Sequence, residues 1–174
     1  MNRRIQSSSL QAPCFLFHKQ AAKEMAIVAL THSSASSRRN NVELAKVGDA
    51  CGRAAAVKAV FKREDLSSGQ DYDRYALSRF ATKNLAPIAR RIGLAELQRV
   101  GRGTPLVSDE MCARVLLALL GVLELTGGNN AVLRAITDLG ILDLPPFRAQ
   151  MDVEELEQTG SRPEPDTIQA PTHW

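Results

Sequence analysis

The pattern of apolar and polar positions along the chain predicts a bundle of helices. Apolar residues recur at the spacing of an amphipathic helix over residues 19–30, 42–62, 72–81, 85–92, 108–125 and 130–139. Aromatic residues are few, and alanine and leucine dominate the middle of the chain. We therefore predict an all-α fold, with polar loops at 31–41 and 63–71 and a connector at 94–106.

Two of these helices organise the rest. The helix over 42–62 has a broad apolar face that contains Gly48 and Gly52, each of which costs up to about 1 kcal/mol inside a helix. Close approach of another helix is the usual compensation, so we expect one to pack against these glycines. The helix over 108–125 has almost no polar face beyond Val115, so we expect it at the centre of the core.

Capping residues set the expected ends of the second central helix. Ser108 is suited to cap its first turn, where Asp109 and Glu110 lie near the positive end of the helix dipole. Gly127 and Gly128 are expected to end it.

The helix over 85–92 contains a proline. A cap at Asn84 would place Pro87 in the first turn, where its missing N–H is tolerated. Gly93 is expected to end this helix.

The chain of 174 residues suits one domain plus tails, and a hydrophobic content of 44% can fill one core. We divide it into a basic N-terminal arm at residues 1–18, a helical domain at 19–146 and an acidic, proline-containing tail at 147–174. The arm is expected to be extended over residues 1–17. Within the tail, residues 149–158 have the composition of a short acidic helix.

The net charge of +3 is unevenly spread. Residues 141–174 hold two arginines and seven acidic residues, a charge of −5, which leaves 20 basic and 12 acidic residues, or +8, on residues 1–140. A basic body is typical of proteins that bind a polyanion such as RNA. An ordinary solubilising surface explains the charge equally well.

The first 23 residues contain arginine, lysine and several serines, with no acidic residue before Glu24. This composition resembles a mitochondrial transit peptide, so we predict a mitochondrial location. An ordinary basic tail is the alternative.

The three cysteines show no paired spacing and no neighbouring histidine cluster, which predicts buried or free thiols in a reducing compartment. We therefore predict no metal site and no cofactor. The three histidines are scattered, and His32 is expected to form structural hydrogen bonds rather than to act in catalysis. No apolar run approaches the roughly 20 residues that cross a membrane, and the longest, at 115–123, is predicted to be a core segment.

Four sequence blocks resemble a ribonuclease III domain. They are ALTHSS at 29–34, ELAKVGDA at 43–50, ARRIGL at 89–94 and ALLGVLELTGG at 118–128. Their order and approximate spacing are similar to that family over roughly residues 26–139. The resemblance implies a ribonuclease III-like helical fold, in a family that cuts double-stranded RNA with divalent metal held by carboxylates of two central helices.

The resemblance also implies that most of these carboxylates are missing. The Glu and Asp of the family's first helix, which share one helix face, fall on Ala45 and Asp49. The Asp and Glu of its second helix fall on Arg114 and Leu117. Mg²⁺ needs oxygen ligands, and Arg114 would repel it. With three of four carboxylates replaced, we expect an inactive domain with no catalytic residue.

No neighbouring acid is placed to substitute for them. Glu43 lies about 240° round the helix from Asp49 and points elsewhere. Asp109 and Glu110 fit better as first-turn acids. Glu124 lies two turns too far along its helix.

The family's domain works as a dimer, and the resemblance places Lys46 where a large apolar residue enters a socket on the partner. Burying an ammonium group without a counter-ion costs several kcal/mol. We therefore expect no symmetric homodimer, whereas a heterodimer with another ribonuclease III-like protein remains open. The residues after the last core helix are too few for the double-stranded RNA-binding domain that these enzymes usually add.

The leading hypothesis is a catalytically inactive structural or RNA-binding subunit of a mitochondrial ribonucleoprotein, either the ribosomal large subunit or its assembly intermediate. It follows from the similarity to inactive ribonuclease III-like proteins of mitochondrial ribosomes. The expected partners are structured RNA and neighbouring proteins. The candidate phosphate contacts are Arg38, Arg39, Lys83, Arg90, Arg91 and Arg102.

Two alternatives remain open. The first is a non-catalytic partner of an active nuclease in a mitochondrial RNA-processing or editing complex. The second is an endonuclease whose metal ligands have relocated, although two-metal chemistry needs bridging carboxylates that the sequence does not supply.

Overall fold

The structure, a computed structural model, describes residues 11–66, 68–103 and 106–147, with side chains from residue 20 onward. Its elements are α1 (Gln11–Ala29), α2 (Val42–Phe61), α3 (Gly69–Tyr75), the 3-10 turn η1 (Leu77–Phe80), α4 (Thr82–Arg91), α5 (Leu94–Leu97) and α6 (Asp109–Asp138). In these ranges the only β pairing is a single bridge between Thr31 and Arg99. The all-α prediction is confirmed.

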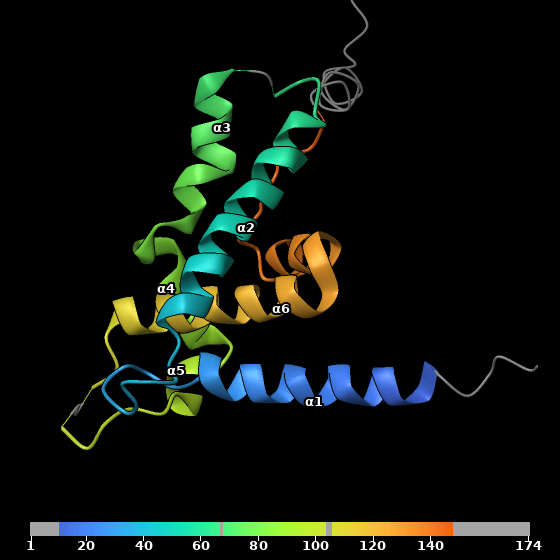
Figure 1. Ribbon diagram of the computed structural model, residues 1–174. Coiled ribbons are helices and arrows are strands. Elements are labelled where there is room, and N and C mark those ends of the chain that lie inside the picture. The colour runs from blue at the N-terminus through green and yellow to red at the C-terminus, as the bar shows by residue number, and fades with distance from the viewer. Residues whose placement is uncertain (1–10, 67, 104–105, 148–174) are drawn as a thin grey trace, which may run out of the picture. The chain divides into compact units, whose positions relative to one another are not determined.

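Helices α2 and α6 cross at the centre of the core, and α1 and α4 also pack against α6 (Figure 1). Six leucine, valine and isoleucine side chains of α6 are buried, whereas Leu125 is 57% exposed. Helix α2 contributes mainly small residues to the core. Small residues on α2 let the two helix axes approach closely. The fully buried side chains of α6 include Val115, Leu116, Leu120, Val132 and Ile136.

Two glycines lie where the backbones of α2 and α6 meet. A Cβ atom added at Gly48 would lie 1.7 Å from the carbonyl oxygen of Leu117, and one added at Gly121 would lie 2.2 Å from the carbonyl oxygen of Leu44. The close helix approach predicted at Gly48 is confirmed. Gly52 instead faces the ring of Phe80, which a Cβ atom would meet at 2.5 Å.

Helix α6 contains a sharp bend at Gly128, which has φ 67° and ψ −173°. The bend separates the two helices predicted over 108–125 and 130–139, so the predicted break is confirmed. Ser108 caps α6 as expected, because its side chain accepts a hydrogen bond from the Met111 N–H at 3.2 Å. Positive φ is costly for residues with a Cβ atom, which explains glycine at the bend.

The apolar character of α6 is that of a buried core helix. By length and composition it could cross a membrane, since an 18-residue window reaches a mean hydropathy of 1.6. Half of that window is buried inside the structure, and α2, α4 and α1 cover it. Its hydrophobicity is therefore accounted for by packing within the domain.

Several predicted boundaries were wrong. Helix α1 begins at Gln11 rather than after residue 17, so it crosses the expected end of the arm. Helix α3 begins at Gly69 inside the predicted loop, because Ser68 and Asp71 form a capping box. It ends at Tyr75, and the turn η1 follows. The connector at 94–106 also contains the short helix α5.

The proline-containing helix α4 begins earlier than predicted. Its first residue is Thr82, so Asn84 lies inside the helix and Pro87 lies in the second turn. The side chain of Asn84 donates to the carbonyl oxygen of Ser78 at 2.8 Å instead of capping α4. The extended backbone of Ala81 starts the helix in its place. The acidic helix predicted over 149–158 and residues 1–10 lie outside the described residues.

Cys51 and Cys112 are free thiols, half-buried and buried respectively. Burial raises the pKa of both thiols. Both are therefore protonated at neutral pH and unreactive, as expected for structural cysteines. Cys14 lies where side chains are not described.

Replacing Gly48 with alanine should force α2 away from the backbone of α6. We expect Gly48→Ala to lower the free energy of unfolding by about 3 kcal/mol, despite the better helix propensity of alanine. Urea denaturation followed by circular dichroism measures this change. The matched control is Gly69→Ala, since no atom lies within 4 Å of a Cβ there. Equal stability of the two variants would contradict the close contact.

Candidate functional site

An open groove of about 480 Å³ lies between α2 and α6, beside the start of α4. All four positions that the sequence assigns to the metal ligands, Ala45, Asp49, Arg114 and Leu117, line it. The other lining residues are Val42, Lys46, Thr82, Glu110 and Ala113. The four positions come from two helices about 65 residues apart in sequence. Their convergence on one groove agrees with the alignment of the four sequence blocks.

The contact between Gly48 and Leu117 positions this groove. Ala45 and Asp49 flank Gly48 on one face of α2, and Arg114 and Leu117 lie one turn apart on α6. Because the two helix backbones touch at Gly48, the α2 pair and the α6 pair lie next to each other where the helices cross. A carboxylate at each position would point into a shared space, and here only Asp49 supplies one.

Asp49 is already bound to a cation. Its carboxylate accepts a hydrogen bond from Arg53 Nε at 2.8 Å, one turn along α2, and its side chain is 40% exposed. Arg53 is held in turn by the carbonyl oxygen of Leu77 at 2.9 Å and by the ring of Phe80 below its guanidinium. Asp49 therefore functions as one half of an ion pair on α2.

The acid and base on α6 pair in the same way. Arg114 binds the carboxylate of Glu110 one turn earlier at 2.6 Å. Lys46 is exposed and forms no ion pair with the described residues. The groove and its immediate neighbour Arg53 thus hold three cations and two carboxylates.

These residues do not fit a hard divalent cation. Mg²⁺ and Mn²⁺ require several oxygen ligands, and the groove lining supplies only two carboxylates, each of which is paired with an arginine. Among the described residues, no group of three or more His, Cys, Asp or Glu is placed to hold a metal ion. The groove lining therefore brings together two carboxylates and two cations, where a two-metal site needs several carboxylates.

Glu43 and Glu124 lie outside the α2–α6 groove. Glu43 lines a different groove with Arg38, Arg39 and apolar residues of α1 and α2. Glu124 is absent from the lining of the α2–α6 groove, and its Oε2 atom is buried without a hydrogen-bond partner among the described residues. Glu110 does line the groove, which the sequence did not suggest, but it is bound to Arg114.

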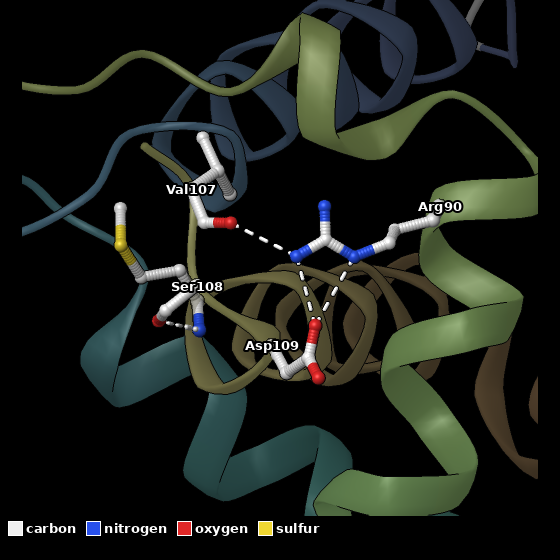
Figure 2. A network of polar contacts seen from close by, with 5 residues as sticks. Arg90, Val107, Ser108 and Asp109 are labelled. Atoms are coloured by element: carbon white, nitrogen blue, oxygen red, sulfur yellow. Dashed lines mark hydrogen bonds and ion pairs between the residues drawn. The ribbon is translucent and has the colours of Figure 1, made fainter. Parts of the chain in front are cut away.

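Asp109 has a structural role, shown in Figure 2. Its Oδ1 atom accepts from Arg90 Nη2 at 2.8 Å and from Nε at 3.1 Å, and Nη2 also donates to the Val107 carbonyl oxygen at 2.9 Å (Figure 2). The contacts tie the end of α4 to the start of α6. Arg90, predicted as a phosphate contact, is therefore engaged in holding two helices together.

The loops at 31–41 and 98–103 are joined edge to edge. The His32 N–H donates to the Arg99 carbonyl oxygen at 2.9 Å, the Arg99 N–H donates to Leu30 at 2.8 Å, and the Gly101 N–H donates to Ser34 Oγ at 3.0 Å. This pairing, which we call the loop pair, carries the arginines of both loops. They are Arg38, Arg39, Arg99 and Arg102.

Three predicted RNA contacts therefore lie on the loop pair, namely Arg38, Arg39 and Arg102, all exposed and without an ion pair to the described residues. Arg39 also lines a groove of about 420 Å³ together with Arg99. Arg99 lies in the predicted connector at 94–106, although it was not among the six candidate contacts. The Thr31–Arg99 bridge that places it has no local sequence signal.

The remaining two predicted contacts lie at opposite ends of α4. Lys83 is exposed near its start, beside the groove residue Thr82. Arg91 lies at its end and donates to the carbonyl oxygen of Leu139 at 2.8 Å. The six candidates thus form no single cluster, and Arg90 and Arg91 are bound to protein groups.

His32 forms the structural hydrogen bonds predicted for it. Its Nδ1 atom accepts from the Ser34 N–H at 3.1 Å and lies 2.9 Å from Ser34 Oγ. Burial, followed by the positive charge of Arg114, holds the pKa of His32 below its ordinary value, and Glu110 opposes the shift weakly. A neutral ring leaves Nδ1 free to accept the Ser34 hydrogen bond.

Two ion pairs at the groove were not predicted, although the sequence spacing that favours them is present. Asp49–Arg53 and Glu110–Arg114 both have acid and base four residues apart on a helix, the spacing that favours an ion pair. Both acids also fit other roles by sequence, Asp49 as a metal ligand and Glu110 as a partner of the helix dipole. Thr82 was missed because its place depends on where α4 begins.

The fold is that of the nuclease domain of ribonuclease III. Two solved structures of this domain from Campylobacter jejuni match it with TM-scores of 0.63 and 0.62, each at 20% identity over 70% of this chain. They are covered over 92% and 90% of their length. The first of them documents flexibility in the region involved in dimer formation of that domain.

Two curated sequences, both of ribonuclease 3, are similar to this chain. Ribonuclease 3 of Caldanaerobacter subterraneus is 32% identical over 127 residues, which cover 67% of this chain and 55% of the relative. Ribonuclease 3 of Pseudomonas fluorescens is 31% identical over 119 residues, covering 66% and 52%. The chain spans about half the length of these relatives, and no protein-family model matches it. This chain is a distant homologue of the ribonuclease III nuclease domain.

Restoring the absent carboxylates should create a metal site if the four positions are aligned correctly. We expect the triple variant Ala45→Glu, Arg114→Asp and Leu117→Glu to bind Mn²⁺ at least about tenfold more tightly than the original chain, since it adds three oxygen ligands. Electron paramagnetic resonance of free Mn²⁺ measures the binding. Adding Asp49→Asn to the triple variant should reverse the gain, and a triple variant without any gain would contradict the alignment.

Protonation of His32 should destabilise the folded chain. Because its pKa is lower in the folded state, the unfolded state binds the proton more readily, and stability falls as pH drops below about 6.5. Urea unfolding at pH 7.5 and 5.5 should show this loss. The variant His32→Gln should lose less stability over that interval, and an unchanged pH dependence would contradict the role given to His32.

Proposed function

We propose that this chain is a non-catalytic, RNA-binding structural subunit of a ribonucleoprotein. The observation that carries the proposal is the composition of the α2–α6 groove. It keeps the geometry of a nuclease site, yet Arg53 and Arg114 occupy both of its carboxylates. Hydrolysis of a phosphodiester by this fold needs metal-bound carboxylates, which the groove does not supply.

Binding of RNA is supported by the loop pair. Arg38, Arg39 and Arg102 are exposed on it, and so is Arg99, whose backbone forms the bridge with Thr31. Exposed guanidinium groups on a joined backbone suit phosphate contacts, which position a protein on RNA without reading bases. Arg90 and Arg91 contribute less in this view, since protein oxygens hold them.

We place the chain in the mitochondrion, as part of the ribosomal large subunit or of its assembly intermediate. The acid-free, arginine- and serine-containing start supports the location. The separation of a basic body from an acidic end supports assembly among RNA and protein together. The similarity to inactive ribonuclease III-like ribosomal proteins supports the particular complex.

A protein partner is supported by the outward face of α2. Lys46, Ala50, Ala54 and Phe61 follow one another along this face, and all are exposed, Phe61 by 76%. An apolar stripe suits packing against a protein partner. In that alternative, Lys46 at its start would pair with a carboxylate of the partner instead of with RNA. This feature favours a heterodimer, and with it the second candidate function, the non-catalytic partner of an active nuclease.

The full-length chain should bind duplex RNA and leave it uncut in Mg²⁺ or Mn²⁺. We expect the double variant Arg38→Gln and Arg39→Gln to weaken binding about tenfold and to lower its salt dependence, because two phosphate contacts are lost. Filter binding at several salt concentrations measures both effects. The charge-matched control is Lys58→Gln with Lys62→Gln at the far end of α2.

Cleavage of the duplex that disappears on Asp49→Asn would contradict the non-catalytic role. The complex itself is tested by sedimentation of the tagged chain from mitochondrial lysate. Co-migration with the ribosomal large subunit or its precursor is expected. Co-purification with an active nuclease free of ribosomal RNA would favour the second candidate instead.

A further inference from the structure

The α2–α6 groove is lined by two cations and two carboxylates. A third cation, Arg53 beside the groove, pairs with Asp49 and leaves one positive charge in excess. Arg53 is fully engaged by Asp49, Leu77 and Phe80. Lys46 lines the groove, is exposed and has no ion pair with the described residues. One positive charge therefore faces the groove without compensation.

Arg114 adds a second cation that can change partners. Its side chain is 30% exposed, while the Glu110 carboxylate that it binds is 72% exposed. An ion pair this close to water contributes little to stability, so exchanging the carboxylate for another anion costs little. A guanidinium group also offers several N–H donors, so it can contact two anions at once.

The start of α4 adds hydrogen-bond donors on the third side. Thr82 is its first residue and lines the groove, and Ala81 before it provides no side-chain cap. The first N–H groups of a helix have no partner within the helix. These N–H groups supplement the two side-chain cations of the groove, Lys46 and Arg114.

We propose that this groove holds a backbone phosphate of RNA directly, without a metal ion, between Lys46 and Arg114. The inference rests on the proposed RNA-binding function and assigns a phosphate subsite to the former metal position. Lys46 provides a point charge, Arg114 provides directed N–H donors, and the Thr82 hydroxyl provides a further donor. The Asp49 carboxylate repels phosphate little, because Arg53 neutralises it.

The charge pattern explains why the metal is dispensable. In a carboxylate site, a divalent cation bridges the acids and the phosphate, so binding depends on the metal. In this groove the protein supplies the positive charge itself. RNA binding should then need no divalent metal, and it should weaken as either Mg²⁺ or monovalent salt is added, because both compete with the protein for the phosphates.

The test is a titration of full-length protein with a duplex RNA of mixed sequence, in Mg²⁺ and in EDTA, at several salt concentrations. We expect affinity in EDTA to be at least as high as in Mg²⁺ at the same monovalent salt concentration. The double variant Lys46→Gln and Arg114→Gln should bind about fivefold more weakly, and the slope of log affinity against log salt should become shallower by one to two units. The control Lys58→Gln with Arg134→Gln removes the same charge outside the grooves and should change neither.

The outcomes separate this inference from the proposed function. If the chain binds RNA, loses affinity through Arg38→Gln and Arg39→Gln, and is unaffected by Lys46→Gln and Arg114→Gln, the phosphate subsite is wrong and RNA binding stands. Binding that requires Mg²⁺ also overturns the subsite. If the original chain binds no RNA in either buffer, both proposals fall. Circular dichroism of each variant identifies any loss caused by unfolding.

Discussion

The contact between the backbones of α2 and α6 is the constraint on which the structure depends. At Gly48 and Gly121 each helix presents a hydrogen atom to a carbonyl group of the other, and no larger side chain fits. This approach buries the apolar side of α6 and completes the core between α2 and α4. It also fixes the level at which the groove-lining residues of the two helices face each other.

The side chains at the groove decide what this contact can hold. Four carboxylates there would hold metal ions, whereas the residues present form ion pairs with arginines. At the four positions where carboxylates would bridge a metal ion, α2 supplies Ala45 and Asp49, and α6 supplies Arg114 and Leu117. The remaining acid is neutralised by an arginine one turn away on its own helix, and Glu110 is neutralised by Arg114. The backbone geometry of the groove therefore goes with ion pairs along each helix, and the phosphate subsite proposed above depends on these pairs.

The helical fold could be predicted from the sequence because the strongest signals were periodic and local. The apolar runs of α2 and α6, the Ser108 cap and the Gly128 bend all lie where the pattern placed them. The start of α4 was misplaced because Asn84 suits a cap by type, whereas the extended backbone of Ala81 starts the helix. The capping box at Ser68 was readable in the sequence and was overlooked.

The sequence predicted which residues line the candidate site, but not all of the contacts that these and neighbouring residues make. The alignment placed Ala45, Asp49, Arg114 and Leu117, and the structure brings them to one groove. The union of loops 31–41 and 98–103 was not predictable, because a single bridge between distant residues leaves no local pattern. The same holds for Arg90, whose contact with Asp109 spans 19 residues and turns a candidate RNA ligand into a structural one.

The central claim is that the α2–α6 groove no longer holds a divalent cation. Anomalous X-ray scattering from crystals of the full chain soaked in Mn²⁺ tests it most directly. The account predicts no Mn²⁺ peak between Asp49 and Arg114, with Asp49 still bound to Arg53. A peak there, surrounded by at least three side-chain oxygen atoms, would contradict it.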